Sequence, residues 1–350
     1  MKTITVNASR DYQILIERDL IPTIGAYTAA VVTPGKAALI CDSNVWPLYG
    51  ETAIMSLQKA GFETFPFVFP SGEASKNPQT YFNILNFLAE NQLTRSDVIV
   101  ALGGGVTGDM AGFAAATYLR GIAYIQVPTS LLAMVDSSVG GKTAIDLPAG
   151  KNLVGAFYQP HLVLCDINAL STLPQSIFRD GCAEIIKYGV LYDAKLFAHL
   201  ASHGTAFNRE YVIARCVELK RNVVAEDEFD TGARQKLNLG HTIGHSIEAL
   251  SGFHISHGQA VALGMDIISK ASASMGYCST ETYRSIHSIL DKFSLSDKVH
   301  FTSRQLYTAA LSDKKRSGGT VNLIIPQAIG NCMLCPLPVE NLQSFIEAGL

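Results

Sequence analysis

The sequence predicts an α/β domain over residues 1–173, followed by a mostly α-helical domain over residues 174–350. In the first half, apolar runs alternate with stretches of helical periodicity, a pattern typical of parallel strands joined by helices. From about Pro174 onward long helical periods dominate, and the segment TLPQS supplies breakers at the boundary. The length of 350 residues agrees with two domains of ordinary size.

Strand and helix patterns follow one another along the first half. A strand pattern over 37–44 ends in a polar turn, and a helix pattern over 51–61 closes with glycine. The continuous apolar run at 97–105 predicts a buried strand that leads directly into glycines. Further patterns predict strands at 65–70 and 123–129, a helix at 77–92 and, among the later helices, one strand at 320–330.

Charge and hydropathy limit the partners and the location. The 27 Lys and Arg residues against 30 Asp and Glu residues give a formal charge of −3, without a block of one sign. A basic face for nucleic acid is therefore not expected, although a local basic pocket stays open. No apolar stretch follows Lys2, and glycines and Asp109 interrupt the richest apolar region, 98–119. We therefore expect a soluble cytoplasmic protein with neither a secretory signal nor a membrane span.

The seven cysteines show no spacing typical of a disulfide framework, which agrees with a reducing compartment. The pair to consider is Cys332 and Cys335. A zinc site would need a second pair or nearby histidines, so we expect two half-buried thiols on a short strand.

The segment GGGVTGD places glycines at 103, 105 and 108, after an apolar strand and before a helical stretch. Glycines there let a pyrophosphate approach the backbone, and the N–H groups of a helix start face its charge. The acidic residue usual about twenty positions downstream is missing, and the nearest suitable one is Asp42, upstream at a strand end. The alternatives are a packing turn and a dinucleotide site in a non-standard order, and Asp42 favours the second.

Four of the nine histidines lie within 241–257. His241 and His245 are four residues apart, so on a helix they share a face. His257 follows after a loop, and Glu184 is a carboxylate in an otherwise apolar helical stretch. A single histidine is usually structural, but this grouping favours a metal site with an open position. The pattern is not the zinc protease motif H-E-x-x-H, because Thr242 stands where that motif needs glutamate, so a zinc protease is not expected.

Several cations lie beside glycines or polar breaks: Lys142, Lys151, Lys187, Lys220, Arg234, Lys314 and Lys315. Most lysine and arginine residues are exposed to solvent at the protein surface and have no special role. The small residues before Lys142 nevertheless resemble a backbone nest for an anion. The segment is not a Walker A loop, because Asp136 stands where that motif needs glycine.

A set of motifs, in this order, resembles the 3-dehydroquinate synthase family: GGGVTGDMAGFAAATYLRGI, VPTSLLAMVDSSVGGKTAID, GKNLVGAFYQP, TLP, GCAEIIKYG, RQKLNLGHTIGHSIEAL and HGQAVALGM. The resemblance covers about Ile40 to Gly330. It implies a Rossmann-like domain that binds NAD, a helical domain that binds Zn²⁺ or Co²⁺, an active site in the cleft, and a homodimer. The implied reaction converts 3-deoxy-D-arabino-heptulosonate 7-phosphate to 3-dehydroquinate and phosphate, in the second step of the shikimate pathway. NAD would oxidise the substrate transiently before phosphate elimination, re-reduction and aldol closure.

The resemblance also implies roles for individual residues. The metal ligands would be Glu184, His241 and His257, with His245 as a proton relay. The NAD contacts would be Asp42, Glu73, Lys76, Gly104, Gly105, Val106, Asp109, Thr129, Ser130, Lys151 and Thr172, with Asp136, Lys142 and Asn152 at the nicotinamide and substrate end. The substrate would be bound by Arg120, Lys142, Asn152, Lys187, Lys220, Arg234, Asn238 and Lys314 or Lys315. Arg120 is expected to reach the partner subunit's site.

Departures from the family pattern occur at Ser176, Ile177, Gln259 and Asp146. Gln259 stands where glutamate is usual, which we expect to weaken the orientation of His257.

Three other functions compete with the expected one. A sibling sugar-phosphate cyclase making 2-deoxy-scyllo-inosose or 2-epi-5-epi-valiolone would lack the carboxylate-side cations, and a metal-dependent polyol dehydrogenase would lack VDSSVGGKT. An inactive NAD-binding subunit would not need the ligand set.

Overall fold

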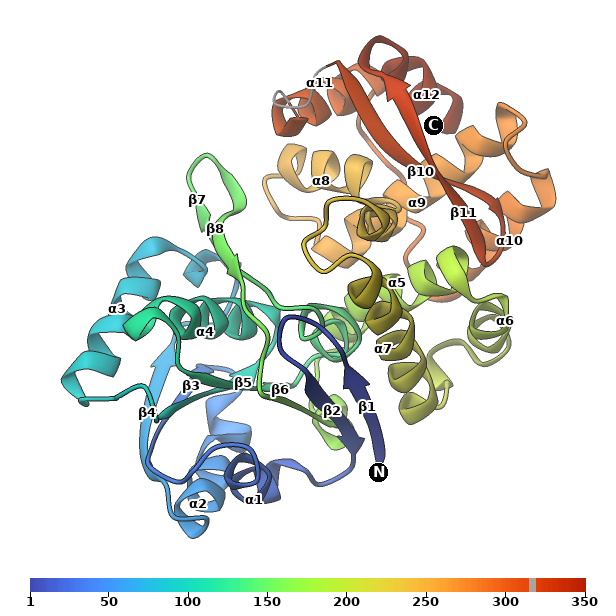
Figure 1. Ribbon diagram of the computed structural model, residues 1–350. Helices are drawn as coiled ribbons and strands as arrows, with labels where there is room; N and C mark the ends of the chain where they lie inside the picture. The colour runs from blue at the N-terminus through green and yellow to red at the C-terminus, as the bar shows by residue number, and fades with distance from the viewer. Residues whose placement is uncertain (315–318) are drawn as a thin grey trace. The chain divides into compact units, whose positions relative to one another are not determined.

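The chain divides into two units, and the computed structural model describes the backbone of residues 1–314 and 319–350 (Figure 1). Side chains are described for residues 1–311 and 319–350. The first unit comprises Met1–Pro174 and Arg209–Phe229, and the second comprises Gln175–Asn208 and Asp230–Leu350.

A seven-stranded sheet with the order β1-β2-β9-β6-β5-β3-β4 forms the centre of the first unit. Only β1 and β2 pair in antiparallel fashion, and the other neighbours are parallel. The strands are β1 (Lys2–Val6), β2 (Tyr12–Glu17), β3 (Lys36–Asp42), β4 (Glu63–Phe69), β5 (Val98–Gly103), β6 (Ala123–Pro128) and β9 (Leu162–Asp166). This architecture confirms the predicted α/β class.

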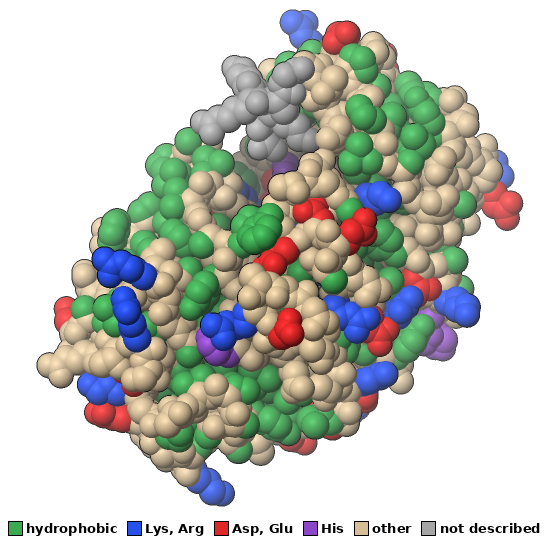
Figure 2. All heavy atoms as spheres, viewed as in Figure 1, with side chains coloured by type: hydrophobic (Ala, Val, Ile, Leu, Met, Phe, Trp, Pro, Cys, Tyr) green, Lys and Arg blue, Asp and Glu red, His purple; other side chains and the backbone are tan. Residues whose placement is uncertain are grey.

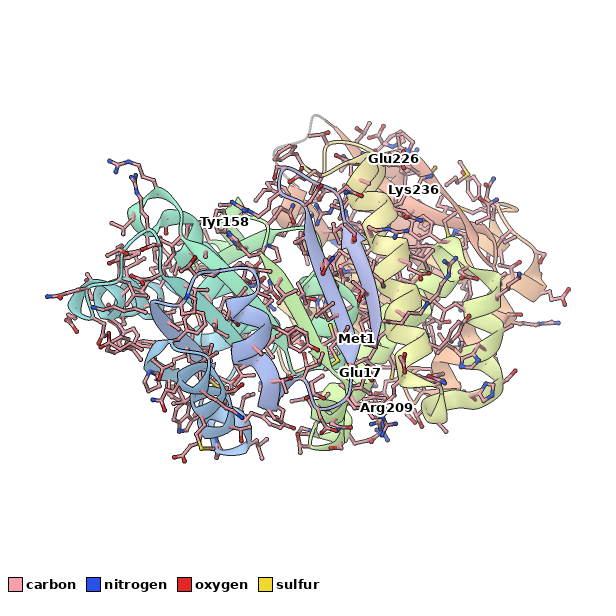
Figure 3. All side chains as sticks on the ribbon, turned by 60° about the horizontal axis from the view of Figure 1, so that its bottom comes forward. Met1, Glu17, Tyr158, Arg209, Glu226 and Lys236 are labelled. Atoms are coloured by element: carbon pink, nitrogen blue, oxygen red, sulfur yellow. The ribbon has the colours of Figure 1, made fainter. Side chains whose placement is uncertain are left out.

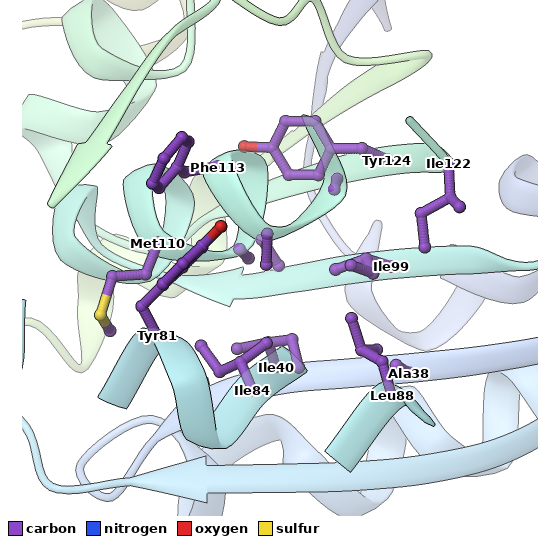
Figure 4. Packing of buried hydrophobic residues seen from close by; sticks show 14 of the residues in the cluster. Ala38, Ile40, Tyr81, Ile84, Leu88, Ile99, Met110, Phe113, Ile122 and Tyr124 are labelled. Carbon is purple, nitrogen blue, oxygen red and sulfur yellow. The ribbon is translucent and has the colours of Figure 1, made fainter. Parts of the chain in front are cut away.

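Helices cover both faces of this sheet, with α3 and α4 on one face and α1 and α2 on the other (Figure 1). Their bounds are α1 (Ile24–Ala29), α2 (Glu51–Lys59), α3 (Pro78–Glu90) and α4 (Gly105–Thr117). Because both faces are covered, every residue of β5 is buried, as its continuous apolar run predicts. Figure 4 shows the core on one face, where side chains of α3 such as Ile84 and Leu88 pack against Ile40 and Ile99 of the sheet.

Successive strands are added to the sheet on opposite sides of β3. From β3 the chain continues outward to β4, then returns to place β5 on the other side of β3. In parallel sheets, ligands bind outside the carboxyl ends of the strands at such a switch point. The topology therefore singles out the ends of β3 and β5, where Asp42 and Gly103 lie.

Two strands form a separate antiparallel hairpin, β7 (Lys142–Leu147) and β8 (Gly150–Phe157). The sequence patterns did not predict this hairpin, because its glycines and charged residues break the alternation of a strand. Its pairing register shifts between Ile145 and Leu147, so Asp146 lies at an irregularity.

The helix α7 (Arg209–Glu226) belongs to the first unit, which corrects the prediction that residues 174–350 all form the second domain. It packs against β1 and β2, as Figure 3 shows beside the labelled residues Met1 and Glu17. After its end, Glu228 accepts hydrogen bonds from Ser9 and from Gln159. Helical periodicity predicted the helix but carried no information on which sheet it covers.

The second unit is mainly helical. Its helices are α5 (Gln175–Tyr192), α6 (Ala194–His203), α8 (His241–Leu250), α9 (His257–Ser274), α10 (Thr280–Lys292), α11 (Ser303–Lys314) and α12 (Leu342–Gly349). The helix α9 packs against α5, α8, α10 and α12. The late predicted strand is β10 (Thr320–Ala328), which pairs with β11 (Asn331–Pro338). Both cysteines of the predicted pair lie on β11, where Cys335 is half-buried as expected but Cys332 is buried.

Within the described parts of the chain, no helix is both long and apolar enough to cross a bilayer. Basic and acidic side chains are interspersed on the drawn face of the molecule, so the described cations do not gather there into one large patch (Figure 2).

Candidate metal and nucleotide sites

Three helices of the second unit bring Glu184, His241 and His257 together. Glu184 lies on α5, His241 is the first residue of α8 and His257 is the first residue of α9. The Glu184 Oε1 atom is 3.5 Å from His241 Nε2 and 3.6 Å from His257 Nε2. One ligand atom from each of the three residues lies within 4.8 Å of the others.

These distances fit a shared metal ion better than direct hydrogen bonds. A nitrogen–oxygen contact of 3.6 Å is too long for a hydrogen bond. Ligand atoms about 2.1 Å from a tetrahedral ion are about 3.4 Å apart, close to the separations found here. Glu184 is 1% exposed and its Oε2 atom pairs with buried Lys187, so Oε1 is the oxygen that faces the two imidazoles.

The protonation states of the two histidines differ. Burial, together with Lys187 and the neighbouring histidines, lowers the pKa of His241 well below its usual value, so this ring is neutral and ready to bind a metal. Burial also works against a charge on His257, but Glu184 and Glu248 raise the pKa of His257 to about 10. A metal ion would therefore displace a proton from His257.

Close helix packing fixes the positions of these rings. Gly240, before α8, has a positive φ of 81°, which favours glycine. A side chain at Gly264 of α9 would lie 2.1 Å from the Gly240 carbonyl oxygen, so the two helices approach as closely as glycines allow. The start of α9 is further held by Asp180 of α5, whose Oδ1 accepts a hydrogen bond from Ser256 Oγ at 2.5 Å.

Two further residues near this cluster bear on the orientation of His257. The Gln259 side chain donates to Leu295 O and Asp297 Oδ2, so these hydrogen bonds do not orient His257. Glu248, which was not predicted, does contact His257, with 3.2 Å between Oε2 and Nδ1. Its position seven residues after His241 places it on the same helix face, and that spacing could have revealed it.

The remaining predicted residues of the second unit occupy varied surroundings. His245 is exposed on α8, with its ring centre 5.5 Å from that of His241 and 6.1 Å from that of His257. Lys187 is buried and paired with Glu184, Arg234 is buried, and Asn238 is exposed. The side chain of Lys314 and all of Lys315 lie outside the described residues.

In the first unit, predicted nucleotide residues gather at the switch point of the sheet. The strand β5 ends at Gly103 and the helix α4 begins at Gly105, with no side-chain cap on its first N–H groups. The neighbouring strand β3 ends at Asp42, whose Oδ2 accepts a hydrogen bond from Thr107 of α4 at 3.4 Å. Thr129, after β6, donates its N–H to Gly103 O at 2.9 Å. A strand end, glycines and an uncapped helix start together suit a pyrophosphate.

A buried lysine connects three further predicted residues. Lys76 Nζ donates to Asp109 Oδ2 and to Asn152 Oδ1, at 2.6 Å in each case. Burial works against its charge, but Asp109 and Glu73 raise the pKa of Lys76, so the ammonium group stays charged. Asn152 has a positive φ of 55°, and its N–H donates to Asp146 at 2.7 Å. The sequence predicts no site role for Asp146, which is a departure from the family pattern.

The structure places the other predicted residues of the first unit as follows. Lys220 of α7 forms an ion pair with Asp136, and Lys151 Nζ lies 3.9 Å from Glu73 Oε1. Gly104 and Val106 belong to the strand-to-helix turn. Ser130 is buried after β6, and Lys142 is exposed at the start of β7. The Thr172 hydroxyl is hydrogen-bonded to the Tyr49 hydroxyl. Arg120 is not brought to this group within its own chain, because it follows the far end of α4, a helix about 20 Å long.

Known proteins resemble the chain over nearly its whole length. A family model described as 3-dehydroquinate synthase N-terminal matches residues 66–180, and one described as 3-dehydroquinate synthase C-terminal matches residues 181–316. A curated 3-dehydroquinate synthase of Streptococcus suis is 43% identical over 98% of this chain and 99% of its own length. That of Pelobacter propionicus is 44% identical, over 98% of both chains.

Solved structures agree with this relationship. The structure of 2-deoxy-scyllo-inosose synthase complexed with carbaglucose-6-phosphate, NAD⁺ and Co²⁺ has a TM-score of 0.90 at 26% identity and covers all of both chains. A 2-epi-5-epi-valiolone synthase from Streptomyces hygroscopicus, with NAD⁺ and Zn²⁺ bound, has a TM-score of 0.89 at 25% identity and covers 99% of this chain and 97% of its own. An iron-containing alcohol dehydrogenase, 14% identical with a TM-score of 0.68, shares the fold alone. The chain belongs to the 3-dehydroquinate synthase family.

Proposed function

We propose that this chain is an NAD- and divalent-metal-dependent lyase that converts 3-deoxy-D-arabino-heptulosonate 7-phosphate to 3-dehydroquinate and phosphate. The observation that carries the proposal is the Glu184–His241–His257 donor set, in a chain 43% identical along its length to a curated 3-dehydroquinate synthase. The sibling cyclases share the fold at only 25–26% identity. Buried Arg234 and Lys220 supply cations suited to an acidic sugar phosphate.

The residues present fit the two expected cofactors. Glu184, His241 and His257 would hold Zn²⁺ or Co²⁺, whose chemistry is to polarise a substrate hydroxyl as a Lewis acid. The Gly103–Gly105 turn would hold the NAD pyrophosphate, and Asp42 would accept hydrogen bonds from a ribose, while the nicotinamide supplies reversible hydride transfer.

The side chains of the chain itself would bind substrate and move protons. We assign proton transfer to His245, because its imidazole is exposed while its neighbour His241 is directed toward Glu184. Arg234, Asn238, Lys142, Asn152 and Lys220 are proposed to bind the carboxylate, hydroxyls and phosphate. Charge-assisted hydrogen bonds to a carboxylate or phosphate are strong, and Arg234 in particular is held nearly free of water.

Phosphate release tests the reaction directly. Purified protein with NAD, Zn²⁺ or Co²⁺ and the heptulosonate phosphate should release phosphate while NADH absorbance at 340 nm stays flat, because the cofactor is regenerated. Accumulating NADH would instead indicate a polyol dehydrogenase. Turnover of only glucose 6-phosphate or sedoheptulose 7-phosphate would indicate a sibling cyclase.

We also propose a cytoplasmic homodimer in which Arg120 serves the partner's site. Leu119 and Arg120 both have positive φ at the end of α4, and Leu119 is 40% exposed. Arg120→Ala and His245→Ala homodimers should each be inactive. Mixed and allowed to exchange subunits, they should recover up to about a quarter of wild-type activity, since half the dimers would be mixed and one of their two sites would be intact. Recovery of no activity after confirmed exchange would place Arg120 in its own subunit's site.

A further inference from the structure

We propose that Glu248 is a positioning residue, which holds the imidazole of His257 so that Nε2, and not Nδ1, binds the metal. The proposal deepens the proposed function and rests on one part of it, that Glu184, His241 and His257 hold a divalent ion.

The His257 ring lies between two carboxylates. Its Nε2 atom faces Glu184 Oε1 at 3.6 Å, and its Nδ1 atom lies 3.2 Å from Glu248 Oε2. A metal-bound histidine usually donates its other ring N–H to a carboxylate or carbonyl, which fixes the tautomer and the ring angle. Glu248 is placed to be that acceptor.

His241 has the same arrangement with a different acceptor. Its Nε2 atom faces Glu184 at 3.5 Å, and its Nδ1 atom lies 3.1 Å from the Leu239 carbonyl oxygen. Both histidines therefore direct Nε2 to the same carboxylate oxygen, while Nδ1 contacts a second oxygen on the other side of the ring. The agreement between two histidines on two helices supports an organised ligand set over a chance contact.

The position of Glu248 is itself well fixed. The side chain is only 4% exposed on α8, and the Glu248 carbonyl accepts hydrogen bonds from Phe253 N and Ser251 Oγ. A side chain at Gly244, between His241 and Glu248, would lie 3.0 Å from the Ala260 carbonyl oxygen of α9. This close packing of α8 on α9 leaves Glu248 little room to move relative to His257.

The backbone of His257 is anchored separately, which isolates the role of Glu248. Ser256 donates to Asp180, and a side chain at Gly258 would lie 2.3 Å from the Asp180 Cα atom. Removing the Glu248 carboxylate should therefore leave His257 in place but free its ring to rotate. The metal would then bind to a ring that must first be ordered, at a cost in affinity.

A second ligand set offers a clear competing outcome. His245, Glu248 and His257 also present ligand atoms within 4.8 Å of one another. In that arrangement Glu248 would be a metal ligand. The two possibilities differ in what happens to the coordination of the ion when Glu248 is replaced.

The test measures metal binding without substrate, on Glu248→Gln and Glu248→Ala in the full chain. Zn²⁺ affinity is measured by competition with a chelator, and Co²⁺ coordination by its visible absorption spectrum. Asp266→Asn is the matched control, because Asp266 makes a similar contact with His287 on the surface, 2.9 Å between Oδ1 and Nδ1. Circular dichroism of the metal-free proteins checks folding, and the nearly isosteric Glu248→Gln keeps the test valid if Glu248→Ala fails to fold.

We expect Glu248→Ala to raise the Zn²⁺ Kd about 10–100-fold and Glu248→Gln to raise it less, because the amide oxygen still accepts the Nδ1 hydrogen. The Co²⁺ spectrum at saturation should keep the wild-type band positions in both variants, and Asp266→Asn should match wild type. Wild-type Kd values in both Glu248 variants would overturn the proposal. A changed Co²⁺ spectrum would overturn it in favour of Glu248 as a ligand. If wild-type protein itself bound no metal, the proposed function would be the part that failed.

Discussion

The two units present their candidate binding groups in contrasting ways. In the second unit the groups are side-chain atoms, a carboxylate and two imidazoles, supplied by the helices α5, α8 and α9. In the first unit the main groups are backbone N–H donors at a strand-to-helix turn, with space left by glycine. Replacing a residue in the second unit therefore removes a ligand, whereas adding a side chain in the first unit fills the space that a ligand needs.

The largest effect is expected from the metal ligands. His257→Ala should weaken Zn²⁺ binding by more than about 100-fold, because a ligand is lost, while His245→Ala should keep the metal and lose about 100-fold or more in turnover. Metal content after dialysis and phosphate release measure the two effects. His287→Ala, on an exposed histidine of the same unit, is the control. Full metal content in both His257→Ala and His245→Ala would refute the assigned ligand set.

The buried lysine of the first unit should give the next largest effect. Lys76→Met leaves Asp109 without its closest cation, which should lower the free energy of unfolding by about 3 kcal/mol. Lys76→Met combined with Asp109→Asn should recover at least half of the loss, because no charge is then left unpaired. Urea unfolding followed by the fluorescence of Trp46, the single tryptophan, reports on this unit. Lys59→Met, at an exposed position on α2, should show no loss, and an equal loss there would exclude a specific role for the pair.

Two glycine substitutions sharpen the contrast between the units. A side chain at Gly104 would meet its nearest neighbour, Ser130 Oγ, at an ordinary 3.5 Å, whereas one at Gly258 would meet the Asp180 backbone at 2.3 Å. Gly104→Ala should therefore fold with wild-type stability and weaken NAD binding about 10-fold, since the space is for a ligand. Gly258→Ala should lower stability by about 1–3 kcal/mol. Calorimetric NAD titration and thermal unfolding measure these effects, and unchanged NAD affinity in Gly104→Ala would exclude this turn as the pyrophosphate site.

The smallest expected effect is a pH dependence within the first unit. Burial, together with Arg10, lowers the pKa of His161 from 6.5 to about 4. The unfolded chain therefore binds a proton more readily, and the stability present above pH 6.5 is lost as the pH falls toward 4. His161→Asn offers an oxygen acceptor to the Tyr124 N–H in place of Nδ1 and cannot titrate there. Between pH 7 and pH 4.5, wild type should lose about 1–2 kcal/mol more than the variant, a value reduced for the partial exposure of the ring. Parallel losses in urea unfolding would show that His161 is not the titrating group.

The contrast between the units also explains what the sequence could predict. Strong apolar periodicity at 97–105 and residue types such as His241 and His257 carry local signals, and the expected strand and donor cluster are found there. The spacing of Glu248 from His241 places both on one helix face, but the contact between Glu248 and His257 also depends on how α8 packs against α9, which no local pattern encodes. The hydrogen bonds of Gln259 to Leu295 and Asp297 depend on packing in the same way, and the sequence shows only that the usual glutamate is absent.

The placement of α7 has a consequence for how the protein is made. The chain passes from one unit to the other after Pro174, after Asn208 and after Phe229. During synthesis, the β1–β2 ribbon emerges long before the helix that packs against it, so the first unit stays incomplete until residue 229 has left the ribosome. By then α5 has already emerged, well ahead of its partner α9. A fragment that ends at Pro174 would lack α7, and with it Lys220 and Glu228, so cutting the gene at that point should not yield a self-sufficient nucleotide-binding module.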